Sequence, residues 1–222
     1  MSVDHSAQLA EASRTCPLCH QTDTNLYFED KRRPYLQCSQ CDLVFVPDVF
    51  RLEPDEEKAV YDLHENDFDD PGYRRFLSRC LDPVVERINK GDIGLDFGCG
   101  PGPVLASMFE EKGWSMAIYD PIYHSDDSVF SRQYNFITST EVIEHVYEPD
   151  IVLKTLIDLL APQGLLALMT KRVRSKEAFT GWHYKNDVTH VGFYSDATFQ
   201  WIADQYRLEL TFVGADLALL KK

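Results

Sequence analysis

Four cysteines near the start of the chain form two Cys-x-x-Cys pairs, Cys16 with Cys19 and Cys38 with Cys41. Each pair can form one tight turn that delivers two thiolates, and two such turns supply the four soft ligands of a tetrahedral zinc ion. A segment this short cannot build an apolar core of its own, and a structural metal takes that role in small domains. The spacing therefore predicts a zinc ribbon over residues 15–50, with these cysteines as the metal ligands.

Disulfide bonding is the main alternative for these cysteines, because secreted proteins oxidise such residues. Residues 1–14 include Asp4 and Glu11 and have no apolar block, so they are predicted to be a flexible tail rather than a signal peptide. No stretch of the chain approaches the roughly 18 apolar residues that cross a membrane. We therefore expect reduced cysteines, a cytoplasmic protein and no membrane partner. His20 adjoins Cys19, but four cysteines already complete a zinc coordination shell.

The composition bounds the size of the fold and its partners. A chain of 222 residues with 44% hydrophobic content can bury one good core plus a small appendage. Its formal net charge is -14, and nucleic acids are bound mainly through Lys and Arg, so the charge argues against a nucleic-acid partner. The basic run at residues 31–33 directly follows Glu29 and Asp30. We predict a solvated hairpin tip there rather than a binding patch.

Strand and helix patterns alternate along the second part of the chain, which predicts an α/β fold with a mostly parallel sheet. The expected strands are 93–97, 114–119, 135–138 and 164–169, and the expected helices are 73–89, 104–112, 150–160 and 196–205. The last two apolar segments, 208–213 and 216–220, are close enough in sequence for an antiparallel hairpin. Residues 51–72 are acidic and rich in turn-forming residues, and are predicted to be a linker or a lid.

A glycine-rich loop follows the first of these strands, with Gly98, Gly100 and Gly102 after Asp96. Glycines remove the Cβ atoms that would keep a ligand away from the backbone, and the next helix presents free N–H groups at its start. Asp120 ends the second strand, where a carboxylate can hold both hydroxyls of a ribose. A loop and an acid of this kind also occur in dinucleotide sites, so on their own they predict only a nucleotide cofactor.

Three segments taken together, residues 95–102, 119–121 and 136–146, resemble class I S-adenosylmethionine-dependent methyltransferases. The resemblance extends from about Tyr73 to the end of the chain and implies a Rossmann-like methyltransferase domain over residues 73–222. It departs from the family between Pro121 and Tyr134, where the chain is too short for the usual helix, strand and helix. We therefore expect the third strand, with its adenine-contacting acid, to be reduced or missing.

The resemblance also implies which residues bind S-adenosylmethionine. They are Asp96, Gly98, Gly100, Gly102, Asp120, Thr140 and Glu141. Tyr73 is added to this set because residues 51–76, with Tyr61 and His64, are expected to close over the cofactor as a lid.

A group of carboxylates and imidazoles supplies the candidates for catalysis. Glu141, Glu144 and His145 have helical spacing and share one arc, and His190 can approach the same pocket. The pattern is similar to that of small-RNA 2'-O-methyltransferases and ubiquinone-pathway O-methyltransferases, which implies a second divalent metal that holds the acceptor hydroxyls. Two other interpretations stand beside it: these residues orient loops, or His190 or His183 acts directly as a general base. The catalytic candidates are therefore His190, His183, Glu141 and His145.

The predicted function is transfer of a methyl group from S-adenosylmethionine to an oxygen, nitrogen or carbon of a small-molecule acceptor, in a chain that also carries a structural zinc ion. Two alternatives remain open. One is a non-catalytic interaction module built on the ribbon and a degraded cofactor fold, against which the intact glycines, Asp120 and Glu141 argue. The other is a metal-dependent RNA 2'-O-methyltransferase.

Overall fold

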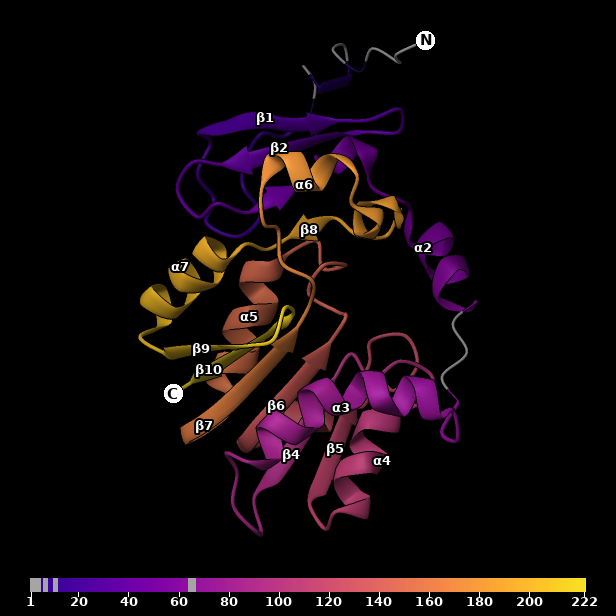
Figure 1. The fold of residues 1–222 in the computed structure, drawn as a ribbon, viewed down its shortest axis with the longest axis vertical. Helices are drawn as coiled ribbons and strands as arrows, with labels where there is room; N and C mark the ends of the chain where they lie inside the picture. The colour runs from indigo at the N-terminus through magenta and orange to yellow at the C-terminus, as the bar shows by residue number, and fades with distance from the viewer. Residues whose placement is uncertain (1–4, 6–7, 10–11, 64–66) are drawn as a thin grey trace.

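The protein is described here by a computed structural model, which covers residues 5, 8–9, 12–63 and 67–222. Its main sheet has six strands in the order β5-β4-β6-β7-β10-β9 (Figure 1). These strands are β5 (Ser115–Tyr119), β4 (Ile93–Phe97), β6 (Tyr134–Thr140), β7 (Leu160–Met169), β10 (Leu217–Lys221) and β9 (Glu209–Val213). The first four run parallel, and β10 is antiparallel to both of its neighbours. The predicted Rossmann-like sheet with a terminal antiparallel hairpin is confirmed.

Helices cover both faces of this sheet. They are α3 (Pro71–Val85), α4 (Val104–Glu111), α5 (Pro149–Asp158) and α7 (Asp196–Tyr206). One buried apolar cluster joins α3 and α4 to the sheet, and another joins α5 and α7 to it. In α3, Leu77, Leu81 and Val84 are buried at helical spacing, which is the stripe that the sequence predicts. Asp70 begins this helix by accepting a hydrogen bond from the Gly72 N–H at 2.7 Å.

The segment that connects β5 to β6 contains no strand of the main sheet. Residues 121–133 are all described, and their one regular element is the 3-10 helix η2 (Asp127–Ser131). Asp126 accepts a hydrogen bond from the Ser128 N–H at 2.9 Å and so caps this short helix. The expected loss of the third strand is confirmed, and β5 is left as an edge of the sheet.

A smaller antiparallel sheet, in the order β1-β2-β3-β8, accompanies the cysteine pairs, and Cys38 is the last residue of β2. Its strands are β1 (Thr24–Glu29), β2 (Pro34–Cys38), β3 (Val44–Phe45) and β8 (Gly192–Phe193). The fourth strand comes from the far end of the chain, and Val44 pairs with Phe193. Figure 1 shows this sheet beyond the carboxyl ends of β6 and β7, with the short helix α6 (Lys176–Thr180) beside it. Backbone pairing between β3 and β8 therefore joins the ribbon to the C-terminal part of the chain.

Residues 51–72 contain a helix that the sequence analysis missed, α2 (Pro54–Tyr61), which follows the 3-10 helix η1 (Asp48–Phe50). Its start has a proline at the first position, and the side chains of Glu53 and Glu56 form a capping box. Acidic residues in the first turn of a helix interact favourably with the helix dipole. The acidic residues that led to the prediction of a linker or lid therefore stabilise the start of α2. His64 lies outside the described residues, as does most of the predicted tail. None of the helices in the described ranges is long and apolar enough to cross a membrane.

The basic run at residues 31–33 is not a fully solvated tip, and that prediction is wrong for Arg33. The Arg33 side chain is buried, with 3% of its surface exposed, whereas Lys31 and Arg32 are exposed. Burial of a guanidinium is costly unless its donors are used, and Arg33 donates to several backbone carbonyls far along the chain.

Candidate active site and metal centre

A cavity of about 760 Å³ opens at the carboxyl ends of β4, β5 and β6. Strand β5 lies on one side of β4, and β6 and β7 lie on the other side, so the chain changes its direction across the sheet at β4. Ligands of open parallel sheets bind at such a switch point. The cavity is lined by the glycine loop on one side and by polar and aromatic side chains from α2, β6 and the segment after β7 on the other. Of the predicted site residues, those that line it are Tyr73, Asp96, Gly98, Gly100, Gly102, Asp120, Thr140, Glu141, His145 and His190.

The glycine loop forms the floor of the cavity and has a conformation that a larger residue would disturb. Gly98 and Gly100 have φ of +75° and +66°, in the left-handed region that glycine adopts readily. A Cβ atom at Gly98 would meet Val142 Cγ2 at 2.4 Å. The Gly98 N–H donates to the Tyr119 carbonyl at 2.7 Å, which ties the loop to the end of β5. This cradle fits a cofactor that is held against bare backbone.

The Asp120 carboxylate holds the glycine loop in place by accepting hydrogen bonds from backbone N–H groups. Its Oδ2 accepts from the Gly100 N–H at 3.0 Å, and its Oδ1 accepts from the N–H groups of Ile122 and Tyr123 at 2.9 and 3.0 Å. A carboxylate has about four acceptor positions, so Asp120 retains capacity toward the cavity. Three of these positions are already used, so one remains, and it suits one hydroxyl of a ribose.

Asp96 lies under the loop at the end of β4 and is almost fully buried. Its Oδ1 accepts a hydrogen bond from Thr138 Oγ1 at 2.8 Å. Burial raises the pKa of Asp96 to about 6, because the charged carboxylate loses its hydration, and the hydrogen bond from Thr138 opposes this only in part.

We expect Asp96→Asn to change how stability depends on pH. A folded-state pKa of about 6 against an ordinary value of 3.8 means that the stabilisation from the neutral form is complete below about pH 4. It is lost as the pH rises to about 6, and totals about 3 kcal/mol. The asparagine amide keeps an acceptor for Thr138 and cannot ionise. In urea unfolding, the variant should therefore gain stability relative to the wild type over this interval; a difference that is constant with pH would contradict the assignment.

A second polar group faces the loop across the cavity, centred on the Tyr184 hydroxyl. This hydroxyl lies 3.1 Å from Glu141 Oε2 and 3.1 Å from Thr170 Oγ1 and also contacts Glu144 Oε1, and its single proton is donated to one of the two carboxylates at a time. Burial raises the pKa of Glu144 to about 8, helped by the charge of Glu141, and burial also raises the pKa of Glu141. Glu141 Oε1 and Glu144 Oε2 are buried without a hydrogen-bond partner among the described residues, and of these two residues Glu141 lines the cavity.

Glu141 has a strained backbone at this position. Its φ is +54°, which is uncommon outside glycine, and its N–H donates to the Met169 carbonyl at 2.8 Å. Residues held in such conformations cluster at functional sites. The turn directs the Glu141 side chain into the cavity instead of extending β6.

Two histidines meet at the same wall. The rings of His145 and His190 lie 4.5 Å apart, and His190 Nδ1 lies 2.7 Å from the Tyr184 carbonyl. A carbonyl only accepts, so the proton of the neutral His190 ring is on Nδ1 and Nε2, which lies 3.8 Å from Asp187 Oδ2, carries the lone pair. Burial lowers the pKa of His190 to about 4, so the ring is neutral at physiological pH. One ligand atom from each of Glu144, His145 and His190 lies within 4.8 Å of the other two.

His183 is placed differently from the other catalytic candidates. It is exposed on the 3-10 helix η3 (His183–Asn186) and does not line the cavity. Its Nε2 lies 3.0 Å from Lys171 Nζ, and Lys171 does line the cavity. His183 therefore touches the site only through that lysine.

Sequence reasoning missed several residues of the cavity wall, namely Glu57, Tyr147 and Asp187. Lys171, which also lines the cavity, comes just after the carboxyl end of β7, where site residues gather in parallel sheets. Glu57 had no such signal in the sequence: it reaches the site only because α2 packs over it. Tyr61, expected in a lid, lines the cavity from the same helix, and its ring lies 5.4 Å from that of His145.

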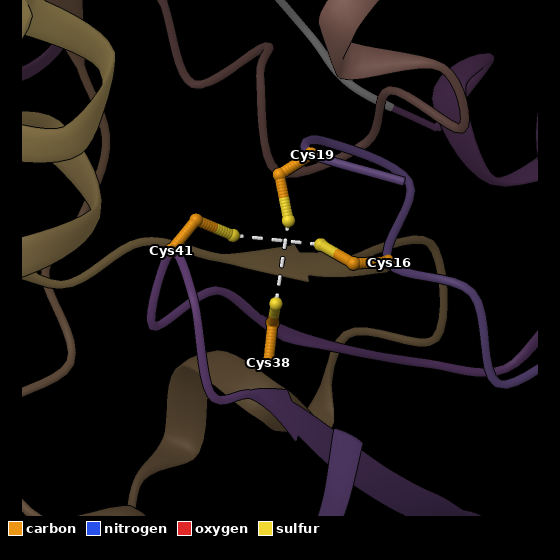
Figure 2. A group of neighbouring side chains, drawn as sticks. All are labelled: Cys16, Cys19, Cys38 and Cys41. Atoms are coloured by element: carbon orange, nitrogen blue, oxygen red, sulfur yellow. Dashed lines mark hydrogen bonds between the residues drawn. The ribbon is translucent and has the colours of Figure 1, made fainter. Parts of the chain in front are cut away.

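The four paired cysteines form a separate centre (Figure 2). Their ligand atoms all lie within 4.8 Å of one another; Cys16 Sγ is 3.5 Å from Cys41 Sγ, and Cys19 Sγ is 3.3 Å from Cys38 Sγ. Zn–S bonds of about 2.3 Å place tetrahedral sulfurs roughly 3.8 Å apart. The sulfur atoms point to one centre, so the cluster fits a zinc ion.

Each cysteine pair ends in the same turn, which explains how the ligands converge. His20 and Asp42, the residues that follow the two pairs, have φ of +60° and +62°. Their N–H groups donate at 3.0 Å to the carbonyls of Cys16 and Cys38. His20 itself is not a ligand, because its Nε2 pairs with Asp150 Oδ2 at 2.8 Å.

A parallel sheet with a glycine loop and an acid at its switch point defines an α/β protein that binds a nucleoside cofactor. Comparison with protein families gives a match to the methyltransferase domain over residues 67–211. That is more than half of the chain, and the protein belongs to this family. It is an S-adenosylmethionine-dependent methyltransferase with a cysteine cluster at its N-terminal side. A search of curated proteins gives no match.

Solved structures share the fold at low sequence identity. Magnesium protoporphyrin IX methyltransferase from Synechocystis PCC 6803, with bound SAH, gives a TM-score of 0.53 at 14% identity and covers 78% of this chain and 95% of that one. Streptomyces venezuelae DesVI gives 0.52 at 13% identity, with 77% and 98% covered. A methyltransferase from Archaeoglobus fulgidus gives 0.52 at 14% identity, with 67% and 94% covered.

Proposed function

We propose that this methyltransferase transfers a methyl group from S-adenosylmethionine to a small-molecule acceptor. The observation that carries the proposal is that one cavity has the glycine loop on one wall and the Tyr184 and His190 group on the other. Cofactor and acceptor can therefore share one enclosed space. The net charge of -14 disfavours a nucleic-acid acceptor, and the reduced cysteine pairs suit the cytoplasm.

The residues that would hold the cofactor are those of the glycine loop and its surroundings, Asp96, Gly98, Gly100, Gly102, Asp120 and Thr140, together with Tyr73 of α3 and Glu141 of the facing group. When bound, S-adenosylmethionine supplies a methyl group that is already activated by its sulfonium. Asp120 would accept a hydrogen bond from a ribose hydroxyl through its remaining acceptor position, and the backbone of the glycine loop would hold the nucleoside. Tyr73 and Tyr61 exclude water from the shared space, which favours transfer over side reactions.

His190 is the residue that we assign to the acceptor. Its Nε2 accepts the proton of an acceptor hydroxyl or amine, since Nδ1 is committed to the Tyr184 carbonyl. His145 packs against it, and Glu141 offers an unpartnered oxygen to the same space. His183 lies outside the cavity lining and takes no part in this proposal.

A second candidate is supported by the short separations among Glu144, His145 and His190. Two imidazoles and a carboxylate suit a divalent transition metal, which would lower the pKa of an acceptor hydroxyl and orient it. In this variant His190 is a ligand instead of a base. Metal analysis of the purified protein separates the two, because zinc in the cysteine cluster alone gives one ion per chain and a metal in the cavity gives a second.

Calorimetry with S-adenosylhomocysteine tests the proposed function. We expect one site per chain, and we expect Asp120→Asn to weaken binding by at least about tenfold, since hydrogen bonds to a charged group contribute about 1.5–3 kcal/mol. Asp126→Asn, on the exposed cap of η2, is the matched control and should bind normally. Absence of binding by the wild type would favour a non-catalytic interaction module.

A further inference from the structure

The buried Arg33 reaches from the ribbon hairpin to one segment of the active-site wall. Its guanidinium donates to the carbonyls of Val188 at 2.7 Å, His190 at 2.8 Å, Asp187 at 2.9 Å and Lys185 at 3.5 Å, and its Nε donates to the Tyr35 hydroxyl at 3.3 Å. The four carbonyls belong to residues 185–190, more than 150 positions along the chain. One ribbon side chain therefore supplies much of the hydrogen bonding that this segment requires.

Other ribbon residues hold the same segment. Arg32 donates to the carbonyl and side-chain oxygen of Asn186 at 2.7 and 2.8 Å. Tyr35 donates to the Lys185 carbonyl at 3.3 Å. Directly after the segment, the Val46 N–H donates to the Val191 carbonyl at 2.9 Å, and β8 joins β3 in the ribbon sheet.

The opposite side of the segment faces the cavity. Asp187 and His190 line it, and the carbonyl of Glu144 accepts from the N–H groups of Val191 and Gly192 at 2.7 and 2.9 Å. The orientation of His190 is therefore set between two supports, the ribbon behind it and the Glu144 turn beside it.

Lysine cannot replace arginine in this role. A guanidinium presents five donors in a fixed fork, whereas an ammonium is a compact charge with a single centre. Without the fork, several buried carbonyls would lose their partner, and each unpaired buried group is costly. The segment would then rearrange to reach water, and His190 would move with it.

We propose that the ribbon is part of the acceptor side of the active site, and that Arg33 is a positioning residue that fixes residues 185–190 and with them the orientation and tautomer of His190. This inference rests on the proposed function, because it gives the ribbon a role in acceptor handling. It predicts that disturbing Arg33 changes the His190 wall and leaves the cofactor loop unaffected.

The test uses full-length Arg33→Lys with Lys31→Arg as the matched control, since Lys31 is exposed on the same hairpin. In nitrogen-15 spectra of labelled histidine, recorded near pH 8, wild-type His190 should show the Nδ1–H tautomer alone. His190→Gln identifies its signal among the seven histidines. Arg33→Lys should show a mixture of tautomers, together with amide exchange in residues 186–192 that is at least about tenfold faster. Lys31→Arg should match the wild type in both.

Calorimetry on the same proteins completes the test. Arg33→Lys should bind S-adenosylhomocysteine within about twofold of the wild type, in keeping with an effect confined to the His190 wall. An unchanged His190 signal and unchanged exchange would overturn the proposal, and so would a loss of affinity as large as that of Asp120→Asn. If the wild type itself fails to bind, the proposed function is lost, while the spectra and exchange still decide whether Arg33 positions His190.

Discussion

Replacement of Gly98 by alanine is expected to reduce the affinity for S-adenosylhomocysteine by at least about 100-fold. The added Cβ would meet Val142 Cγ2 at 2.4 Å, and the residue would keep a φ of +75°. A left-handed conformation costs about 1–2 kcal/mol outside glycine, and an inserted methyl group in a packed site costs about 1–3 kcal/mol. The loop can relieve both only by moving away from the end of β5, which destroys the surface that holds the cofactor. Calorimetry measures the loss.

Gly113→Ala provides the matched control for this prediction. Gly113 also has a positive φ, +94°, but a Cβ there would have no atom within 4 Å. It should therefore lose some stability through the backbone and bind S-adenosylhomocysteine as the wild type does. If Gly98→Ala bound normally while remaining folded, the loop would not be the cofactor cradle.

Replacement of Cys38 by serine is expected to remove the metal and unfold the ribbon. Structural zinc contributes about 10 kcal/mol or more to small domains of this kind, and the buried apolar residues of the ribbon, such as Tyr35 and Val44, belong to a cluster that the ribbon shares with residues 173–193. Metal content should fall from about one ion per chain toward zero. Hydrogen exchange should accelerate throughout β1, β2 and β3, and also in β8, because β8 pairs with β3.

Cys80→Ala is the control for this second prediction. Cys80 is a buried cysteine of α3 and lies outside the four-cysteine cluster. Its loss should lower stability by about 1–2 kcal/mol through the small cavity that it leaves, with the metal retained. Full metal content and unchanged exchange in Cys38→Ser would show that the cluster is not a zinc site.

The two predictions concern parts of the protein that local sequence specifies well. The cysteine pairs converge because each pair makes the same one-turn knuckle, with His20 and Asp42 in the left-handed region. The glycine loop is equally local, since Gly98 and Gly100 bend the chain directly after β4. The alternation of strands and helices, the absence of a third strand after β5 in the fully described segment 121–133, and the terminal hairpin also follow from spacing along the chain.

Three features of the active-site wall escaped sequence reasoning because they depend on contacts between distant residues. The two residues of β8 do not show a strand pattern in the sequence. They form a strand because their backbone pairs with that of β3. Arg33 looks like part of a solvated charged tip until residues 185–190 are folded over it. His183 and His190 are equivalent as sequence candidates, but only His190 lines the cavity.

The sequence by itself determined the cysteine turns, the glycine loop and the alternation of strands and helices, because these arise from residue types at short, fixed spacings. The tertiary structure alone decided which histidine faces the cavity, where α2 lies and how the ribbon joins the acceptor wall. The join between the ribbon and this wall depends on buried hydrogen bonds between segments far apart in the chain, such as those from Arg33 to the carbonyls of Lys185 and His190. The free energy of such contacts comes from desolvation and packing that local sequence patterns do not encode.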